Sequence, residues 1–414
     1  MISRRWAIIG IIGAIALAEL VFIALIEIGK LDLFGVNKKN KEQVIKNYLG
    51  IDGLPSNEVA TDLGAKWTRV FLSWKEIDEN GWDEFSQKID QLGGTQLVAT
   101  ILADNPKEII CTQGAGSCPI AEIVRYEEFV RIASRQYAGK IKFWQIEDEV
   151  FSPKSTWQGS VEQYQKVLET AYKILKNASK DNQIILGGIN LKNLSVNQPT
   201  NDLQIIEGNL AKVFANPEFF DIVDTRFFDT IASIPARIKW LDKKMRAFNF
   251  QKPIWSLGIS GPDLSSGAYS EDTQAEEIAK RMLAGFEAGA EKLFYFRYQS
   301  LDTGQSDPLS ATLGLVETGG KQKKPFKAYK FMSEKISGFS SLKNLNLTGG
   351  ATGYQLSFND RKPLFVIWAS APLVVKLPQE ILPIVKEYDY LGNPIAIAER
   401  NVNISSQPIF IEIE

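Results

Sequence analysis

The residues best suited to chemistry form an acidic run, Glu147-Asp148-Glu149, which directly follows the apolar segment Ile141–Ile146. If that segment is a strand, alternation of side chains puts Glu147 and Glu149 on one side and Asp148 on the other. Crowded carboxylates raise one another's pKa, which suits an acid catalyst, whereas neighbouring arginines would hold the same groups as buried ion pairs. The run therefore has two interpretations, a working acid and an ion-paired remnant.

The composition limits what chemistry can surround these acids. The 414 residues include no histidine and two cysteines. This excludes Ser-His-Asp and Cys-His nucleophile pairs, His-ligated zinc and the usual haem ligands. Any chemistry must use carboxylates, Arg, Lys, Tyr or a borrowed cofactor, and we expect no cofactor and no metal. Lys and Arg number 47 against 49 Asp and Glu, giving a net charge of -2, so we expect no nucleic-acid partner.

The N-terminus has the pattern of a membrane segment. Met1–Arg5 is short and basic, and Trp6–Ile26 is an apolar run with a single charge. At 1.5 Å per residue such a helix reaches about 30 Å, one bilayer core. We expect a single-pass anchor over 1–30 and a polar tether over 31–46, with the remaining chain outside the cytoplasm. The alternative is a cleaved signal peptide, because Ala16-Leu17-Ala18 resembles a cleavage site.

Cys111 and Cys118 enclose a short, glycine-containing segment. Such a segment can close a small disulfide ring in an oxidising compartment, which agrees with an extracytoplasmic location. The alternative is two unrelated thiols.

From about residue 47 to 341, strand-like and helix-like segments alternate. The strand-like runs are Tyr48–Gly53, Thr68–Ser73, Gln96–Leu102, Ile141–Ile146, Ile184–Ile189, Asp221–Phe227, Pro253–Leu257 and Lys292–Phe296. Helix-like stretches begin near Asn57, Trp82, Ile123, Ser160, Asn201, Thr230, Glu271 and Pro325. This α/β rhythm predicts a (β/α)8 TIM barrel. A doubly wound open sheet is less consistent, because no dinucleotide-binding fingerprint follows the first strand.

The rhythm changes at about residue 342. Short strand-like runs separated by turn residues continue to residue 414, with no helical pattern between them. The runs are Tyr354–Phe358, Pro363–Trp368, Leu373–Leu377, Ile384–Tyr388, Ile395–Ala398 and Ile409–Ile413. Residues 342–414 therefore predict a C-terminal all-β module, sandwich-like and packed on the barrel.

In a TIM barrel, functional side chains lie at the C-terminal ends of the strands. These ends supply a candidate site of Arg69, Trp74, Glu147, Asp148, Glu149, Asn190, Arg226, Phe228, Trp255, Gly258, Arg297 and Tyr298.

Five segments resemble, in order and spacing, the motifs of clan-A glycoside hydrolases. They are Leu63–Val70 with Trp74, Trp144–Glu149, Asp221–Thr225, Lys252–Trp255, and Gly314-Leu315 followed by Lys324–Tyr329. The terminal module resembles the accessory sandwich of xylosidase-like members. The resemblance spans about residues 47 to 414. It implies a carbohydrate partner, either a polysaccharide or a glycoconjugate.

The resemblance assigns Glu149 to the general acid/base of that family. Gly258 falls at the position of the nucleophilic glutamate, so the nucleophile position is degenerate, and glycine cannot form a glycosyl-enzyme ester. Asp148 replaces an Asn that precedes the acid/base. Arg226 and Phe228 stand where the family usually carries His and Tyr.

Arg69 matches an Arg that flanks the nucleophile in relatives. The rings of Trp74, Trp255, Phe228 and Tyr298 would stack on sugars or simply pack the barrel.

Three functions remain open. The chain is a pseudoenzyme that binds carbohydrate or protein as an envelope scaffold, or it hydrolyses glycosides with relocated carboxylates, or its site is closed. For relocated chemistry, Glu149 would act with Asp104, Asp229, Asp263 or Asp302, and inversion tolerates about 6.5–9.5 Å between the two carboxyls.

Overall fold

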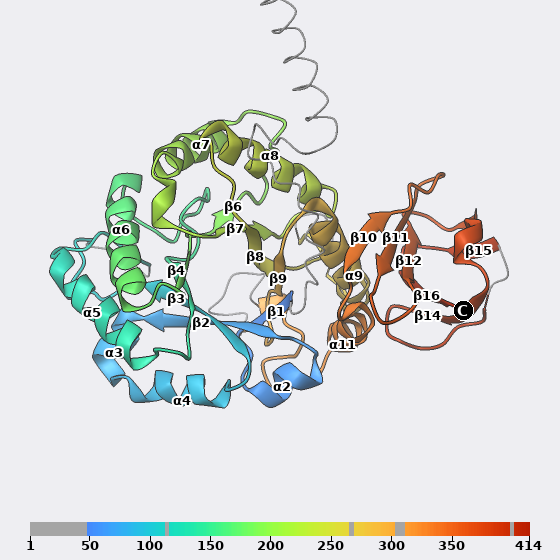
Figure 1. Cartoon of the computed structure of the whole chain (residues 1–414), viewed down its shortest axis with the longest axis horizontal. Coiled ribbons are helices and arrows are strands. Elements are labelled where there is room, and N and C mark those ends of the chain that lie inside the picture. The colour runs from blue at the N-terminus through green and yellow to red at the C-terminus, as the bar shows by residue number, and fades with distance from the viewer. Residues whose placement is uncertain (1–47, 112–115, 265–268, 303–310, 398–400) are drawn as a thin grey trace, which may run out of the picture. The chain divides into compact units, whose positions relative to one another are not determined.

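The computed structural model describes residues 48–111, 116–264, 269–302, 311–397 and 401–414 (Figure 1). The predicted anchor over 1–30 and tether over 31–46 lie outside these ranges. Within them, no helix is both long enough and apolar enough to span a bilayer.

A curled sheet of nine parallel strands forms the centre of the fold (Figure 1). Its order is β5-β4-β3-β2-β1-β9-β8-β7-β6. The strands are β1 Leu49–Asp52, β2 Trp67–Ser73, β3 Gln96–Leu102, β4 Phe143–Ile146, β5 Gln183–Ile185, β6 Ile189–Asn190, β7 Val223–Phe227, β8 Ile254–Ile259 and β9 Lys292–Tyr295. Each strand overlaps one of the eight predicted runs. The run Ile184–Ile189 overlaps two strands, β5 and β6.

The two ends of this sheet meet. Ile185 at the end of β5 forms a parallel bridge with Ile222, just before β7, and the Leu186 N–H donates to the Ile222 carbonyl at 2.9 Å. The sheet therefore closes on itself. Closure brings the C-terminal ends of all the strands to one mouth, where the candidate residues were expected.

Helices surround the sheet (Figure 1). They are α2 Asn57–Asp62, α3 Trp74–Asn80, α4 Asp83–Gln91, α5 Ile123–Gln136, α6 Val161–Ala178, α7 Asn201–Phe214, α8 Ser233–Ala247, α9 Glu271–Ala288 and α11 Lys324–Ile336. The sequence did not predict α3.

Ser160 caps α6. Its side chain accepts from the Gln163 N–H, and the Gln163 side chain accepts from the Ser160 N–H, which completes a capping box.

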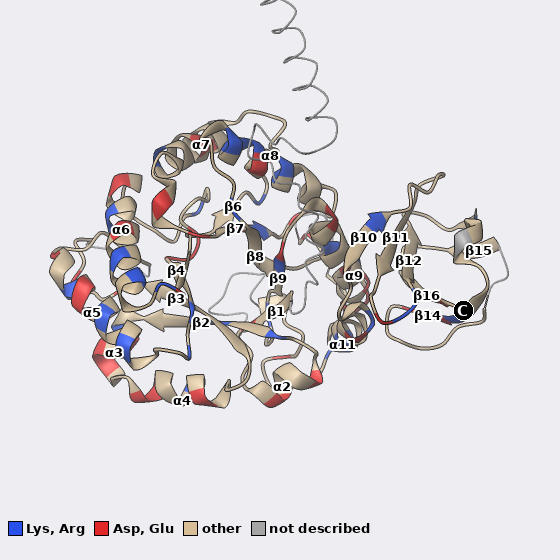
Figure 2. Cartoon of the chain, viewed as in Figure 1, with Lys and Arg blue, Asp and Glu red and all other residues tan. Residues whose placement is uncertain are grey.

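The helices are amphipathic, which explains their place in the fold. Along α6 the buried residues Val161, Tyr164, Leu168 and Leu175 recur at helical spacing. Figure 2 shows Lys, Arg, Asp and Glu along the outer helices α4, α5 and α6, where water solvates them.

The C-terminal residues form antiparallel sheets. A five-stranded sheet has the order β10-β11-β12-β16-β14, and β13 pairs with β15. The strands are β10 Ser341–Asn344, β11 Ala351–Ser357, β12 Leu364–Ala369, β13 Leu373–Lys376, β14 Ile384–Tyr388, β15 Asn401–Ile404 and β16 Ile409–Ile413.

Barrel and β-module contact each other directly. Phe331 of α11 packs against Phe410 of β16 with ring centroids 5.0 Å apart, and Lys335 pairs with Glu412 at 2.7 Å. The described residues belong to one compact unit. The boundary between 341 and 342 remains a prediction from the sequence.

Candidate functional site

The acidic run begins where β4 ends, and its first residue leaves the strand. Glu147 has a left-handed backbone with φ 65° and a fully buried side chain. Its Oε1 accepts a hydrogen bond from the Ala103 N–H at 2.8 Å. Burial raises the pKa of this carboxyl to about 8. The expected alternation is therefore wrong, because it requires an extended backbone at Glu147.

Asp148 lies between two arginines. Its Oδ1 accepts from Arg69 Nη1 and from Arg226 Nη2, each at 2.6 Å. Burial alone would raise the pKa of Asp148, but the two guanidinium groups outweigh it and hold that pKa below its ordinary value. Asp148 is therefore an ionised partner in a network of ion pairs, and it is not a proton donor.

Each arginine has a second acidic partner. Arg69 contacts Asp52 of β1 through Nε at 3.2 Å and Nη2 at 2.9 Å. Arg226 of β7 donates from Nε to Asp224 Oδ2 at 2.8 Å. Both guanidinium groups are buried, with 1% of each side chain exposed. The ion-paired interpretation therefore applies to Asp148, in a chain of contacts that joins β1, β2, β4 and β7.

Glu149 is the less buried of the two glutamates of the run, both of which have a raised pKa. It is half-buried, and its Oε2 accepts from Asn190 Nδ2 of β6 at 2.8 Å. Burial and then the charge of Asp148 raise its pKa above the ordinary value, although Arg226 and Asn190 oppose them. A protonated carboxyl here can donate to a ligand oxygen.

The space beside Gly258 of β8 is filled. A Cβ built on this glycine would lie 2.9 Å from Phe228 Cζ and 3.1 Å from both Cδ and Nη1 of Arg226. A glutamate would need both side chains to move. Arg226, which pairs with Asp148, therefore packs against Gly258, the residue that the sequence resemblance aligns with a nucleophile.

The other proposed acids have their own partners. Asp104 accepts from Ser73 Oγ at 2.6 Å and from the Lys75 N–H at 3.0 Å. Asp229 pairs with Arg237, and its Oδ2 also accepts from the Asn193 N–H.

Asp263 adds its negative charge to the surroundings of Arg237. Asp302 is exposed and lines a pocket of about 340 Å³ beside Tyr269 and Lys323. Throughout the described residues, no group of three or more Asp, Glu or Cys is placed to hold a metal ion.

The two candidate tryptophans lie in packed surroundings. Trp74 is the first residue of α3 and stacks on Phe129 of α5, with centroids 5.2 Å apart and planes 12° apart. Trp255 packs against Trp67, and the Lys292 ammonium lies 5.1 Å from its ring, near the N-terminal ends of the strands. Neither has the surroundings of a sugar platform at the mouth.

The remaining candidates lie near the C-terminal ends of β7 and β9. Phe228 is buried and meets Phe296 edge-on at 5.2 Å. The Arg297 guanidinium lies 5.7 Å from the centroid of the Phe296 ring. The Tyr298 N–H donates to the Asp52 carbonyl at 2.9 Å, and burial raises the pKa of the Tyr298 hydroxyl.

Sequence reasoning missed three polar residues of the site, Asp52, Gln145 and Asp224. Asp224 Oδ2 accepts from Gln145 Nε2 at 2.8 Å, and its Oδ1 accepts from the Leu257 N–H at 2.8 Å. A signal existed for Asp224, because it stands two places before Arg226 in a predicted strand and alternation puts both on one side.

Comparison with solved structures identifies the fold of this chain. No family sequence model and no curated protein sequence matches the chain. A family 39 glycoside hydrolase from Bacteroides cellulosilyticus WH2 aligns with TM-score 0.69 and 13% identity, over 90% of this chain and 82% of that chain. A glucosidase from Croceicoccus marinus aligns with TM-score 0.64 and 12% identity, over 89% and 95%.

A GH39 β-xylosidase from Caulobacter crescentus aligns with TM-score 0.57 and 13% identity, over 89% of this chain and 95% of that chain. At these identities the alignments establish the fold alone. The fold that the sequence motifs indicated is thus confirmed: the chain has a clan-A glycoside hydrolase-like fold.

Proposed function

We propose that the chain is a glycoside hydrolase-like protein that engages a polysaccharide or glycoconjugate through Glu149 without forming a glycosyl-enzyme. One observation carries this proposal: the acid Glu149 is present, whereas neighbouring side chains fill the space beside Gly258, where a nucleophile would be expected. Glu149 keeps a raised pKa, while Phe228 and Arg226 lie 2.9 and 3.1 Å from the Cβ position of Gly258.

The chemistry of retention explains why this pairing matters. A retaining glycosidase needs a second carboxyl about 5–5.5 Å from the acid, which attacks the anomeric carbon. Asp148 is adjacent in sequence, but two guanidinium groups at 2.6 Å engage its Oδ1. A carboxylate so held is a poor nucleophile, and glycine offers no substitute. Binding is therefore the function that the geometry supports best.

Hydrolysis by inversion is a second candidate, and the raised pKa of Glu149 favours it. In that mechanism a protonated Glu149 would protonate the leaving oxygen, and a second carboxylate would activate water. Asp104, at the C-terminal end of β3, is a candidate base. Hydrolysis with inverted product would identify this mechanism.

We also propose that residues 1–30 anchor the protein in a membrane, with the barrel outside the cytoplasm. An apolar run of bilayer length and a basic N-terminal flank support the anchor. The disulfide between Cys111 and Cys118 agrees with an oxidising compartment. Protease accessibility of the β-module in intact and in permeabilised cells would test this topology.

The test of function uses the full chain in mild detergent. Oligosaccharide panels are screened for binding by calorimetry, and aryl glycosides and polysaccharides are screened for sugar release. Above the pKa of Glu149, where the wild type presents an ionised carboxylate, we expect Glu149→Gln to weaken binding by about tenfold or more, since a hydrogen bond to a charged group contributes about 1.5–3 kcal/mol.

Glu162→Gln is the matched control, because Glu162 lies on α6 with 58% of its side chain exposed. It should bind like the wild type. Equal binding by the wild type and by Glu149→Gln would refute the assigned role of Glu149. A covalent glycosyl-enzyme trapped with a fluorinated glycoside would refute the binding-only proposal.

A further inference from the structure

Two chain segments beside the mouth form a hairpin that a disulfide closes. Its arms are residues 108–111 and 117–121, here called the disulfide hairpin. Ile109 and Ile120 form an antiparallel bridge, and the Ile110 N–H donates to the Pro119 carbonyl at 3.0 Å. A disulfide between Cys111 and Cys118 joins the two arms, with Cα atoms 6.0 Å apart. The bond fixes the second arm relative to the first.

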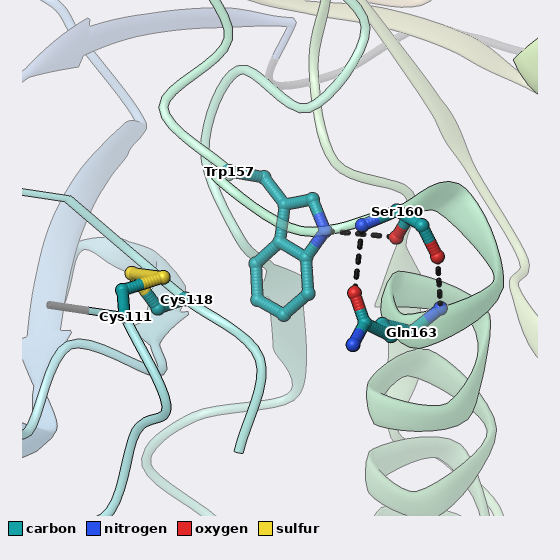
Figure 3. Close-up of a disulfide and its surroundings, with 5 residues drawn as sticks. All are labelled: Cys111, Cys118, Trp157, Ser160 and Gln163. Carbon is teal, nitrogen blue, oxygen red and sulfur yellow. Dashed lines mark hydrogen bonds between the residues drawn. A yellow bond between two sulfur atoms is a disulfide. The ribbon is translucent and has the colours of Figure 1, made fainter.

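The second arm of the hairpin pairs with the segment that follows the acidic run. The Ser117 N–H donates to the Thr156 carbonyl at 3.1 Å, and the Gln158 N–H donates to the Ser117 carbonyl at 2.9 Å. Ser117 and Trp157 thus form a parallel bridge. Figure 3 shows Trp157 between the disulfide and the first turn of α6, where its Nε1 donates to the Ser160 carbonyl at 3.0 Å.

Thr156 in turn holds Glu149 by two reciprocal hydrogen bonds. The Thr156 N–H donates to the Glu149 carbonyl at 3.1 Å, and the Glu149 N–H donates to Thr156 Oγ1 at 3.1 Å. Both backbone groups of the acid are therefore satisfied by one residue. That residue is itself held by the disulfide hairpin through Ser117.

A second path leads from the hairpin to Glu147. The Cys118 N–H donates to the Ala103 carbonyl at 3.1 Å, and the Ala103 N–H donates to Glu147 Oε1 at 2.8 Å. Cys118 is fully buried. Both outer acids of the run are thus connected to Cys118 or its neighbour by short chains of hydrogen bonds.

From this arrangement we infer that the Cys111–Cys118 disulfide, acting through Ser117 and Thr156, positions Glu149 for its ligand. The inference rests on the proposed function for the identity of that ligand. Thr156 and the two cysteines are positioning residues, since no contact with a ligand is required of them. Opening the disulfide should release residues 117 and 118, and then Thr156, while the barrel strands stay in place.

Hydrogen exchange measures this positioning without any ligand. The full chain in mild detergent is compared in three forms: oxidised, reduced with a water-soluble phosphine, and carrying Cys111→Ser with Cys118→Ser. Reduction splits the S–S bond into two thiols, and the phosphine supplies the two electrons and becomes its oxide with oxygen from water. We expect amides in 147–158 to exchange about tenfold faster in the two opened forms, with α9 unchanged.

The chain supplies its own control, because it has two cysteines and the double variant has none. The phosphine should not alter exchange in that variant, so any effect on the wild type arises at this bond. Thr156→Val removes the Oγ1 acceptor but keeps the backbone groups, and it should accelerate exchange at Glu149. Thr156→Ser keeps the hydroxyl and should restore wild-type exchange.

The pH profile of binding separates positioning from general stability. The pKa of Glu149 is raised first by burial. A loosened loop admits water, so the pH midpoint of Glu149-dependent oligosaccharide binding should move to lower pH in the opened forms and in Thr156→Val. Thr156→Ser should keep the wild-type midpoint.

Three results would overturn the inference: unchanged exchange in 147–158 after reduction, faster exchange throughout the barrel, or a Thr156→Ser variant that behaves like Thr156→Val. If no oligosaccharide binds to any form, the proposed function fails. The exchange data then decide the positioning role by themselves.

Discussion

Replacing Glu147 by Gln tests the electrostatics of the acidic run directly. The pKa of this carboxyl is raised from 4.5 to about 8 by burial, so the folded protein keeps a proton that the unfolded chain releases. Below pH 4.5 both states hold the proton, and the folded state bears no penalty. As the pH rises from 4.5 towards 8, the unfolded state is increasingly favoured.

The size of the effect follows from the linkage between proton binding and folding. Over this window the free energy of unfolding falls by about 1.4 kcal/mol for each pH unit, or on the order of 5 kcal/mol in all. Gln matches the protonated carboxyl in shape and still accepts from the Ala103 N–H. It carries no proton to lose, so Glu147→Gln removes the slope that Glu147 contributes.

The assay is urea unfolding of the full chain in mild detergent, followed by the fluorescence of its nine tryptophans. Wild type and Glu147→Gln should agree within about 1 kcal/mol near pH 5, and the variant should be more stable by several kcal/mol near pH 8.5. Glu162→Gln is the control, since the pKa of Glu162 is lowered to about 2 by its hydrogen bond from Lys212 and does not titrate in this range. A stability difference between wild type and Glu147→Gln that does not change with pH would refute the reasoning.

Three further predictions concern the same region. Asp148→Asn leaves the two buried guanidinium groups without their shared charge and should lower the free energy of unfolding by about 3 kcal/mol in urea; an unchanged midpoint would contradict the ion-pair network. Gly258→Glu forces Phe228 and Arg226 apart and should cost about 1–3 kcal/mol without creating glycosidase activity on aryl glycosides; a gain of retaining activity would show that the site is only one residue from catalysis. Ser160→Ala removes the cap of α6 and should cost about 1 kcal/mol, whereas a loss near zero would assign the start of α6 to packing alone.

The positions of the barrel strands were predictable because apolar runs, helical patterns and turn residues are local features of the sequence. The predicted run Gln96–Leu102 matches β3 at both ends. The region after residue 342 was harder: β10 and β15 were not predicted, and the expected strand near Ile395 is not formed in the described part of that segment. A short edge strand has too few residues to show a clear alternation of apolar and polar side chains, so pairing with neighbouring strands determines whether it forms.

At the site, the sequence located the residues but not their roles. Arg69, Asp148, Glu149 and Arg226 were all expected at the mouth, and the structure connects them through hydrogen bonds and charge. Trp74 was expected at a strand end, but the chain turns into α3 there, and the ring packs on a neighbouring helix.

The sequence by itself determined the α/β rhythm and the absence of histidine, and the family resemblance predicts that Gly258 stands at the nucleophile position. It could not decide between a working acid and an ion-paired remnant, because both depend on which charges face each carboxylate. In the tertiary structure Asp148 pairs with Arg69 and Arg226, and burial raises the pKa of Glu149. Burial and charge contacts between residues far apart in the chain arise only when the sheet closes, so no local pattern could have supplied them.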